Sequence, residues 1–130
     1  MASNDPLVFI DASFLLDVIL PNRRRYELAK KFLAKEPSLA ISSLSVHLAV
    51  HFGKKYSLSP SDVRNTLAEL KILPIDATTV NWAFEHMIGG DYEDALQVAC
   101  AVLGECQEFV TFDRSLAKNY SRFIKVVVPR

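Results

Sequence analysis

The sequence lacks an excess of charge of either sign, because 15 lysines and arginines balance 15 aspartates and glutamates. Bulk charge therefore gives no indication of a nucleic-acid partner, and any basic surface must be local. Cysteine is scarce: there are two, Cys100 and Cys106, without CxxC spacing and without a histidine cluster beside them. This pattern argues against a disulfide framework or a structural zinc site, and it suits a reducing cytosol.

Two kinds of targeting segment are also missing. No apolar run approaches the roughly 18 residues of a membrane span. The opening "MASNDPLVFI" has neither the basic start nor the long apolar stretch of a signal peptide. We therefore expect a cytoplasmic protein that is not associated with membranes. Half of the 130 residues are hydrophobic, which predicts one folded domain over residues 1–130 with a proper core.

Short apolar runs alternate with helical patterns along the chain. Strands are predicted over residues 7–10, 38–42, 72–75, 108–112 and 123–128. Helices are predicted over residues 14–19, 23–36, 44–55, 60–71, 76–88, 91–104 and 113–119. The alternation predicts an α/β protein, a three-layer α/β/α sandwich with a central parallel sheet. Pro74 places the third strand toward an edge of that sheet, because proline cannot donate to the ladder.

Two of the predicted strands end in an aspartate that is followed at once by a helix. Asp11 follows "LVFI", and Asp113 follows "FVTF". Asp94 stands in the first turn of the helix that leads back into the second of these strands, so it should begin at the same edge. Because ligands bind outside the carboxyl edge of a parallel sheet, we expect the three carboxylates to converge there.

An aspartate at a helix start can also serve only as an N-cap. In "DYED", Asp91 is best interpreted as a cap, with Asp94 at the third position of a pattern similar to a capping box. Taken together, however, three clustered carboxylates repel one another, and a divalent cation among them relieves the repulsion. Ligands that are all oxygens favour Mg²⁺ or Mn²⁺ over zinc.

The segments "VFIDASFLLDVI", "DYEDALQ" and "FVTFDRSL" resemble, in this order, the three aspartate blocks of the PIN domain. Their spacing resembles that of a small member, such as a VapC-type toxin ribonuclease. The resemblance implies a PIN-like sandwich and a hydrolase that cleaves RNA phosphodiesters with Mg²⁺ or Mn²⁺. It also implies the toxin of a type II toxin–antitoxin pair, with an inhibitory antitoxin protein as partner and a homodimer as a common assembly.

The same resemblance implies roles for individual residues. Asp11, Asp94 and Asp113 would be the metal ligands and the catalytic residues, and Ser13 and Thr111 would be hydroxyls that orient them. A divalent ion would lower the pKa of a bound water and neutralise charge that develops on the phosphate. Such a site needs neither a histidine nor a serine nucleophile.

One element of the family pattern is missing. Most active members carry a glutamate early in the helix after the second strand, but no acidic residue stands between Leu39 and Tyr56. A gapless alignment puts His47 or Leu48 at that place. His47 could replace the glutamate as a metal ligand or phosphate contact. Alternatively, one or both of His47 and His51, which are four residues apart on one helix face, are partly buried histidines hydrogen-bonded to the backbone.

Local basic residues are candidates for RNA contact. They include the "RRR" of residues 23–25, Lys54 and Lys55, and the two residues Arg114 and Lys118 that follow Asp113. Arg114 is favoured because it is adjacent to a predicted metal ligand. The lysines of the helix after "RRR" fit a solvated helix face instead.

Three functions remain open at this point. The first is the metal-dependent ribonuclease, and the second is a catalytically impaired PIN-like module that binds RNA or protein without the usual glutamate. The third is a small α/β protein that binds Mg²⁺ for phosphoryl transfer, as receiver and phosphatase domains do. The third is disfavoured because "DASFL" lacks the second acid that a DxD phosphatase carries two residues after the first.

Overall fold

The computed structural model describes residues 6–36 and 38–130. Within them, five strands form one sheet in the order β3-β2-β1-β4-β5, and each pair of neighbours is parallel. The strands are β1 (Val8–Ile10), β2 (Leu39–Ser42), β3 (Lys71–Leu73), β4 (Glu108–Val110) and β5 (Lys125–Val127). The predicted α/β fold with a central parallel sheet is confirmed, and β3 lies at an edge as Pro74 indicated.

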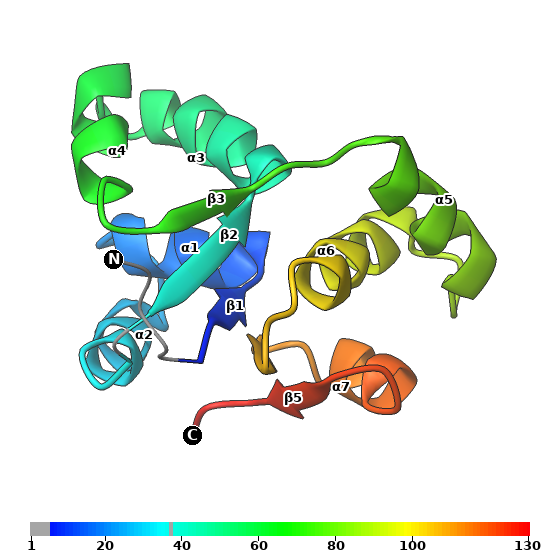
Figure 1. The fold of residues 1–130 in the computed structure, drawn as a ribbon. Helices are drawn as coiled ribbons and strands as arrows, with labels where there is room; N and C mark the ends of the chain where they lie inside the picture. Colours follow the sequence, from blue (N-terminus) through cyan, green and yellow to red (C-terminus); the bar gives the residue numbers. More distant parts are fainter. Residues whose placement is uncertain (1–5, 37) are drawn as a thin grey trace.

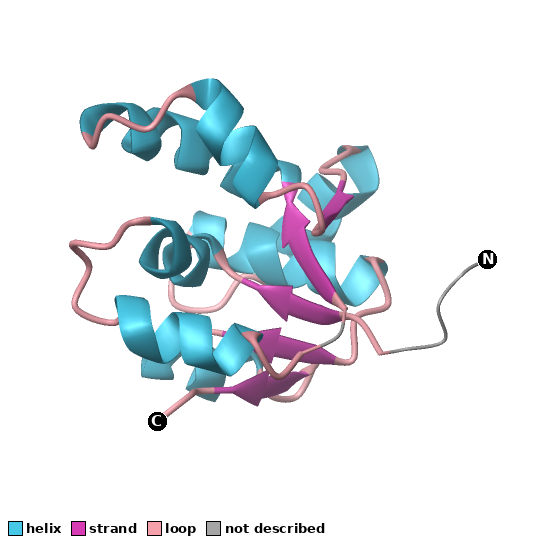
Figure 2. Cartoon of the chain, turned by 90° about the vertical axis from the view of Figure 1, so that its left-hand side faces the viewer, coloured by secondary structure: helices cyan, strands magenta, loops and turns pink. Residues whose placement is uncertain are grey.

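Seven helices in the described residues cover the two faces of this sheet (Figures 1 and 2). The helices are α1 (Ala12–Ile19), α2 (Tyr26–Leu33), α3 (Ser43–Lys55), α4 (Pro60–Thr66), α5 (Ala77–His86), α6 (Tyr92–Leu103) and α7 (Arg114–Tyr120). The first four pack on one face, and α5, α6 and α7 pack on the other. No helix of the described residues is both long and apolar enough to span a membrane.

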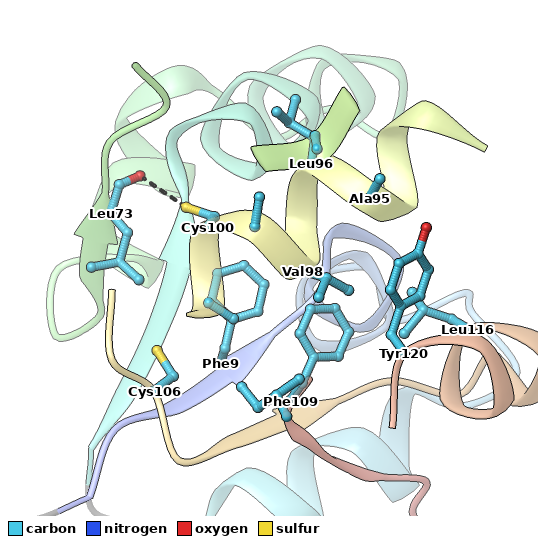
Figure 3. Packing of buried hydrophobic residues seen from close by; sticks show 14 of the residues in the cluster. Phe9, Leu73, Ala95, Leu96, Val98, Cys100, Cys106, Phe109, Leu116 and Tyr120 are labelled. Carbon is cyan, nitrogen blue, oxygen red and sulfur yellow. Dashed lines mark hydrogen bonds between the residues drawn. The ribbon is translucent and has the colours of Figure 1, made fainter. Parts of the chain in front are cut away.

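Alternation along the strands divides the hydrophobic core into two layers. Phe9 and Phe109 face the layer of α6 and α7, and their rings stack with centroids 5.1 Å apart (Figure 3). Ile10 and Val110, one residue further along each strand, face the layer of α1, α2 and α3. Each strand therefore contributes apolar side chains to both faces, which is why the strands read as continuous apolar runs in the sequence.

The helix predicted over residues 23–36 begins only at Tyr26. The Arg23 N–H donates to the Leu20 carbonyl, and the Tyr26 N–H donates to the Arg23 carbonyl, so the chain turns before the helix starts. The prediction was wrong here because arginine is compatible with a helix and gives no boundary signal. The three consecutive arginines consequently lie in a turn, which changes how their side chains are arranged.

Other boundaries also differ from the prediction. The helix predicted over residues 60–71 ends at Thr66, since the chain must turn before it enters β3. The strand predicted over residues 72–75 stops before Pro74, which has no N–H to donate. The strands predicted over 108–112 and 123–128 are shorter in the structure. They comprise only β4 and β5, because the residues between β4 and α7 and between α7 and β5 form the connections to that helix.

The turn before α6 depends on two glycines. Gly89 and Gly90 have φ angles of 77° and 79°, a left-handed conformation that glycine adopts without steric cost. The Tyr120 hydroxyl of α7 accepts a hydrogen bond from the Ile88 N–H (2.9 Å) and donates to the Ile88 carbonyl (3.3 Å). Together these features hold the entry to α6, and hence its first turn, beside α7.

Candidate functional site

The order of the strands places a crevice beside the first strand. β1 lies at the centre of the sheet, with β2 on one side and β4 on the other. The chain builds outward from β1 to β3, returns through α6, and then builds the other half from β4 to β5. Ligands of open α/β sheets bind at the carboxyl ends of the strands where the order reverses in this way. That point lies between the ends of β1 and β4.

Asp11 lies directly at this point. Its N–H donates to the Val110 carbonyl at the end of β4 (3.2 Å), and its side chain is only 6% exposed. Oδ1 accepts from the Phe14 N–H (2.8 Å), and Oδ2 accepts from the Thr111 hydroxyl. Burial raises the pKa of Asp11 to about 6, although the two hydrogen bonds act in the opposite direction.

Thr111 connects two of the aspartates. It is fully buried, and its hydroxyl donates to Asp11 while accepting from the Asp113 N–H (3.0 Å). Asp113 in turn is the N-cap of α7, with Oδ1 accepting from the N–H groups of Ser115 (2.9 Å) and Leu116 (3.1 Å). The capping interpretation thus accounts for one oxygen of Asp113. Within the described residues, its other oxygen has no hydrogen-bond partner.

Asp94 lies at the third position of α6 but does not complete a capping box. Asp91 is the N-cap, as predicted, and its Oδ1 accepts from the Asp94 N–H (3.1 Å). The Asp94 carboxylate makes no hydrogen bond or ion pair with any described residue. It is half-buried, and burial, followed by repulsion from Asp91, Asp113 and Asp11, raises its pKa to about 7. A carboxylate in this state is suited to bind a cation rather than to stabilise the helix.

The three aspartates line one small cavity of about 60 Å³. Its full lining is Asp11, Ala12, Ser13, Glu93, Asp94, Gln97 and Asp113. Ser13 is exposed at its rim, and Gln97, which is 2% exposed, lies in its wall. Gln97 Nε2 donates to the Ser42 hydroxyl (3.0 Å), and Gln97 thereby ties α6 to the end of β2.

Glu93 is an acidic residue of this cavity that was not predicted from the sequence. Consecutive residues of a helix point in directions about 100° apart, so an acid next to Asp94 would be expected on another face. Glu93 and Asp94 both reach the cavity because it lies over the very end of α6. The two adjacent acids in "YEDALQ" were a signal, but they also fit ordinary pairing with the positive end of the helix dipole.

The two residues proposed at the place of the absent glutamate differ in position. His47 is exposed and stacks against His51, with ring centroids 6.3 Å apart, and it does not line the acidic cavity. Leu48 is half-buried and lines an adjoining groove together with Ser13 and Glu93. Arg114, at the start of α7, is exposed and also stands outside the cavity lining.

The donor chemistry of the cavity suits a hard divalent ion. Four carboxylates supply only oxygen, which matches Mg²⁺ or Mn²⁺. Within residues 6–36 and 38–130, no three acidic, imidazole or thiol groups already converge as a finished coordination sphere. Asp94 and one oxygen of Asp113 have no competing hydrogen bond, so they can turn toward an ion. Because Mg²⁺ keeps several of its waters, it can bind to such an incomplete set of protein ligands.

The raised pKa values predict how the metal-free protein responds to pH. Asp11 and Asp94 have pKa values of about 6 and about 7 when folded, against about 3.9 in an unfolded chain. Between pH 4 and 7 the folded state therefore holds more protons, and the free energy of unfolding falls as the pH rises. After discounting for solvent screening at Asp94, we expect a loss of about 1 kcal/mol from pH 5.5 to 8.

Urea denaturation at a series of pH values in EDTA measures this change. Asp94→Asn is the matched control. It removes the larger of the two pKa shifts, so the free energy of unfolding should depend less on pH. A free energy of unfolding that rises between pH 5.5 and 8 in the wild-type chain would contradict the prediction.

Comparison with known proteins gives a consistent picture of the family. A family model described as the PIN domain matches residues 8–121. A search of curated protein sequences finds no match. Among solved structures, a toxin–antitoxin complex from Klebsiella pneumoniae has a TM-score of 0.72 and 23% sequence identity, covering 95% of this chain and 98% of that one.

Two further structures show the same fold. Mycobacterium tuberculosis VapC20, a toxin that cleaves the sarcin–ricin loop, has a TM-score of 0.73 and 18% identity over 94% of this chain and 99% of its own. VapBC2 from Rickettsia felis, bound to a promoter DNA fragment, has a TM-score of 0.63 and 18% identity, covering 95% and 99%. The family model runs from β1 to the end of α7 and includes all three aspartates, and the chain belongs to the PIN domain family.

Proposed function

We propose that the protein is a metal-dependent endoribonuclease and the toxin of a type II toxin–antitoxin pair. The observation that carries the proposal is the shared cavity of Asp11, Asp94 and Asp113 at the point where the strand order reverses. Three aspartates from opposite ends of the chain, two of them with raised pKa values, form an arrangement that costs stability unless a cation is bound.

The residues around the cavity have distinct tasks in this proposal. The carboxylates of Asp11, Asp94 and Asp113 would hold a divalent ion, which would act as a Lewis acid toward water and phosphate oxygen. Asp11 is the rigid ligand, since both of its oxygens are held by hydrogen bonds. Asp94 and Asp113 are the ligands that adjust their orientation, and Thr111 positions Asp11 relative to Asp113. Ser13, at the rim, is placed to contact the water or the phosphate.

The partners follow from the same comparison. The similar structures include a toxin–antitoxin complex and VapBC2, so we propose an antitoxin protein that blocks the cavity, and a homodimer as the assembly. Both would act in the cytoplasm, where the RNA substrate is found.

A second candidate function is a PIN-like module that binds RNA or protein without cleaving it. Two observations favour it. The described residues contain no finished coordination sphere, and Leu48 lines the groove beside the cavity where the usual glutamate is expected. The two candidates differ in whether the cavity holds a metal productively.

Cleavage of labelled RNA by the purified chain separates the two functions. We expect single-stranded or loop-containing RNA to be cut in Mn²⁺ or Mg²⁺ and to stay intact in EDTA. Isothermal titration with each metal, without RNA, should show binding to the wild-type chain. If the chain binds RNA but neither binds metal nor cleaves any RNA offered, the binding module is the better description.

A further inference from the structure

We infer that the turn between α1 and α2 forms a pocket for a phosphate of a single-stranded RNA backbone, beside the carboxylate cavity. The inference rests on the proposed nuclease function and extends it to how the substrate is held. The pocket has a volume of about 350 Å³. It is lined by Ser13, Asp17, Arg23, Arg24, Arg25, Phe112 and Asp113.

The three consecutive arginines line one pocket, and they precede the helix instead of lying within it. On a helix, neighbouring side chains point about 100° apart, so residues 23–25 would spread around the axis. In the structure they lie in consecutive turns before α2 begins at Tyr26, and all three line the same pocket. The late start of α2 is thus what gathers the positive charge.

Two of the arginines are held in place by the protein. Arg23 Nε donates to Asp17 Oδ1 at 3.0 Å, and Asp17 is buried. The guanidinium of Arg25 lies 4.8 Å from the centre of the Phe112 ring, which itself stacks on Phe14. Neither contact uses all of a guanidinium's five N–H donors, so donors remain for a ligand. Because these contacts already hold the two side chains, less side-chain entropy is lost when a ligand binds.

The charges of the pocket favour an anion. Arg24 is exposed and makes no hydrogen bond or ion pair with a described residue. Asp17 is already paired with Arg23, which leaves Asp113 as the one other acidic residue of the lining beside Arg24 and Arg25. The planar fork of a guanidinium matches two oxygens of a phosphate, which a lysine cannot do.

The pocket adjoins the candidate catalytic cavity, because Ser13 and Asp113 line both. An RNA strand carries phosphates in series. If one phosphate lies at the carboxylates, its neighbour along the strand can lie among the arginines. The carboxylates need a cation to hold a phosphate, whereas the arginines do not, so this part of RNA binding should be independent of metal.

The test uses the full chain with Asp94→Asn, in EDTA, so that cleavage cannot occur. Binding of a fluorescein-labelled oligouridine is followed by anisotropy over a series of KCl concentrations. Adding Arg24→Gln and Arg25→Gln should weaken binding about tenfold and lower the slope of log K against log[KCl] by about 0.7 to 1.4, for one to two lost phosphate contacts. Lys31→Gln with Arg64→Gln removes two exposed charges elsewhere and should change both values less.

Each result decides the inference. If the variant with Arg24→Gln and Arg25→Gln has the same affinity and salt slope as the control with Lys31→Gln and Arg64→Gln, the pocket does not bind RNA. The inference is also overturned if the arginine change abolishes binding of a polyglutamate peptide or of inorganic phosphate and leaves RNA binding intact. If the wild-type chain fails to cleave RNA but arginine-dependent binding persists, the nuclease proposal fails and the phosphate pocket stands.

Discussion

Replacing Asp94 by asparagine is expected to abolish metal-dependent RNA cleavage and, in the metal-free protein, to raise the melting temperature. Cleavage should fall by on the order of 10²–10³-fold or more, because a negative ligand of the activating ion is lost. The melting temperature at pH 8 should rise by about 4 °C, the equivalent of about 1 kcal/mol for a chain of this size. The substitution removes the cost of burying a charged carboxylate and, after that, its repulsion from Asp91, Asp113 and Asp11.

Asp94 is the most informative of the three aspartates because its carboxylate makes no hydrogen bond with a described residue. Asp113 caps α7 through Oδ1, and asparagine caps nearly as well, so Asp113→Asn should abolish cleavage with a smaller rise in melting temperature. Asp11 accepts from both Phe14 and Thr111. An amide group there would face one donor with another donor, so Asp11→Asn should lower the melting temperature.

Thermal melts in EDTA and in Mn²⁺ provide the measurement. Mn²⁺ should raise the melting temperature of the wild-type chain, since an ion that binds only the folded state stabilises it, and should have little effect on Asp94→Asn. An unchanged or lower melting temperature for metal-free Asp94→Asn would mean that this carboxylate stabilises the fold and is not held there against repulsion.

Glu93→Gln is expected to weaken Mg²⁺ and Mn²⁺ binding by on the order of tenfold to a hundredfold, as loss of a supporting carboxylate does in other metal sites. Glu93 lines the acidic cavity and also the groove that Leu48 lines. It is therefore placed to supply the negative charge that the family usually draws from α3. Leu48→Glu in the Glu93→Gln background should restore binding, because it returns a carboxylate to the same wall.

His47→Glu in the same background is the matched control, because it adds the same charge one residue away on α3. His47 is exposed and stacks on His51, so we expect no recovery of metal affinity. Isothermal titration of the wild type, Glu93→Gln and the two double variants with Mg²⁺ and Mn²⁺ gives the comparison. Recovery by His47→Glu alone would support the other alignment, in which His47 replaces the glutamate. In that case activity should prefer Mn²⁺ over Mg²⁺, because Mg²⁺ binds an imidazole nitrogen poorly.

The sequence predicted the positions of Asp11 and Asp113 well because both follow buried strands. An apolar run that stops at an aspartate marks the end of a strand, and parallel strands end at a common edge. Asp94 could be placed at the same edge because the helix it begins returns to β4. The structure brings these three side chains into one cavity; their role as metal ligands stays a prediction.

The features that the sequence did not predict depend on the ends of helices and on small rotations. The arginine pocket exists because α2 begins at Tyr26, and no residue in "NRRRYELAK" marks that boundary. Glu93 reaches the cavity because the cavity lies over the end of α6. The choice between His47 and Leu48 is a rotation of about 100° about the axis of α3, which local propensity does not determine.

The hydrogen bond between Thr111 and Asp11 joins residues 100 positions apart in the chain. Contacts of such long separation form late in folding, because the entropy of closing the intervening loop must be offset first. During synthesis, β1 leaves the ribosome well before β4 can pair with it, so the carboxylates cannot assemble on a nascent chain until β4 has emerged. A polypeptide that ends before β4 would keep Asp11 and Asp94 but have no completed site. On the proposed function, the nascent chain would stay inert beside the messenger RNA that encodes it until β4 has emerged and paired with β1.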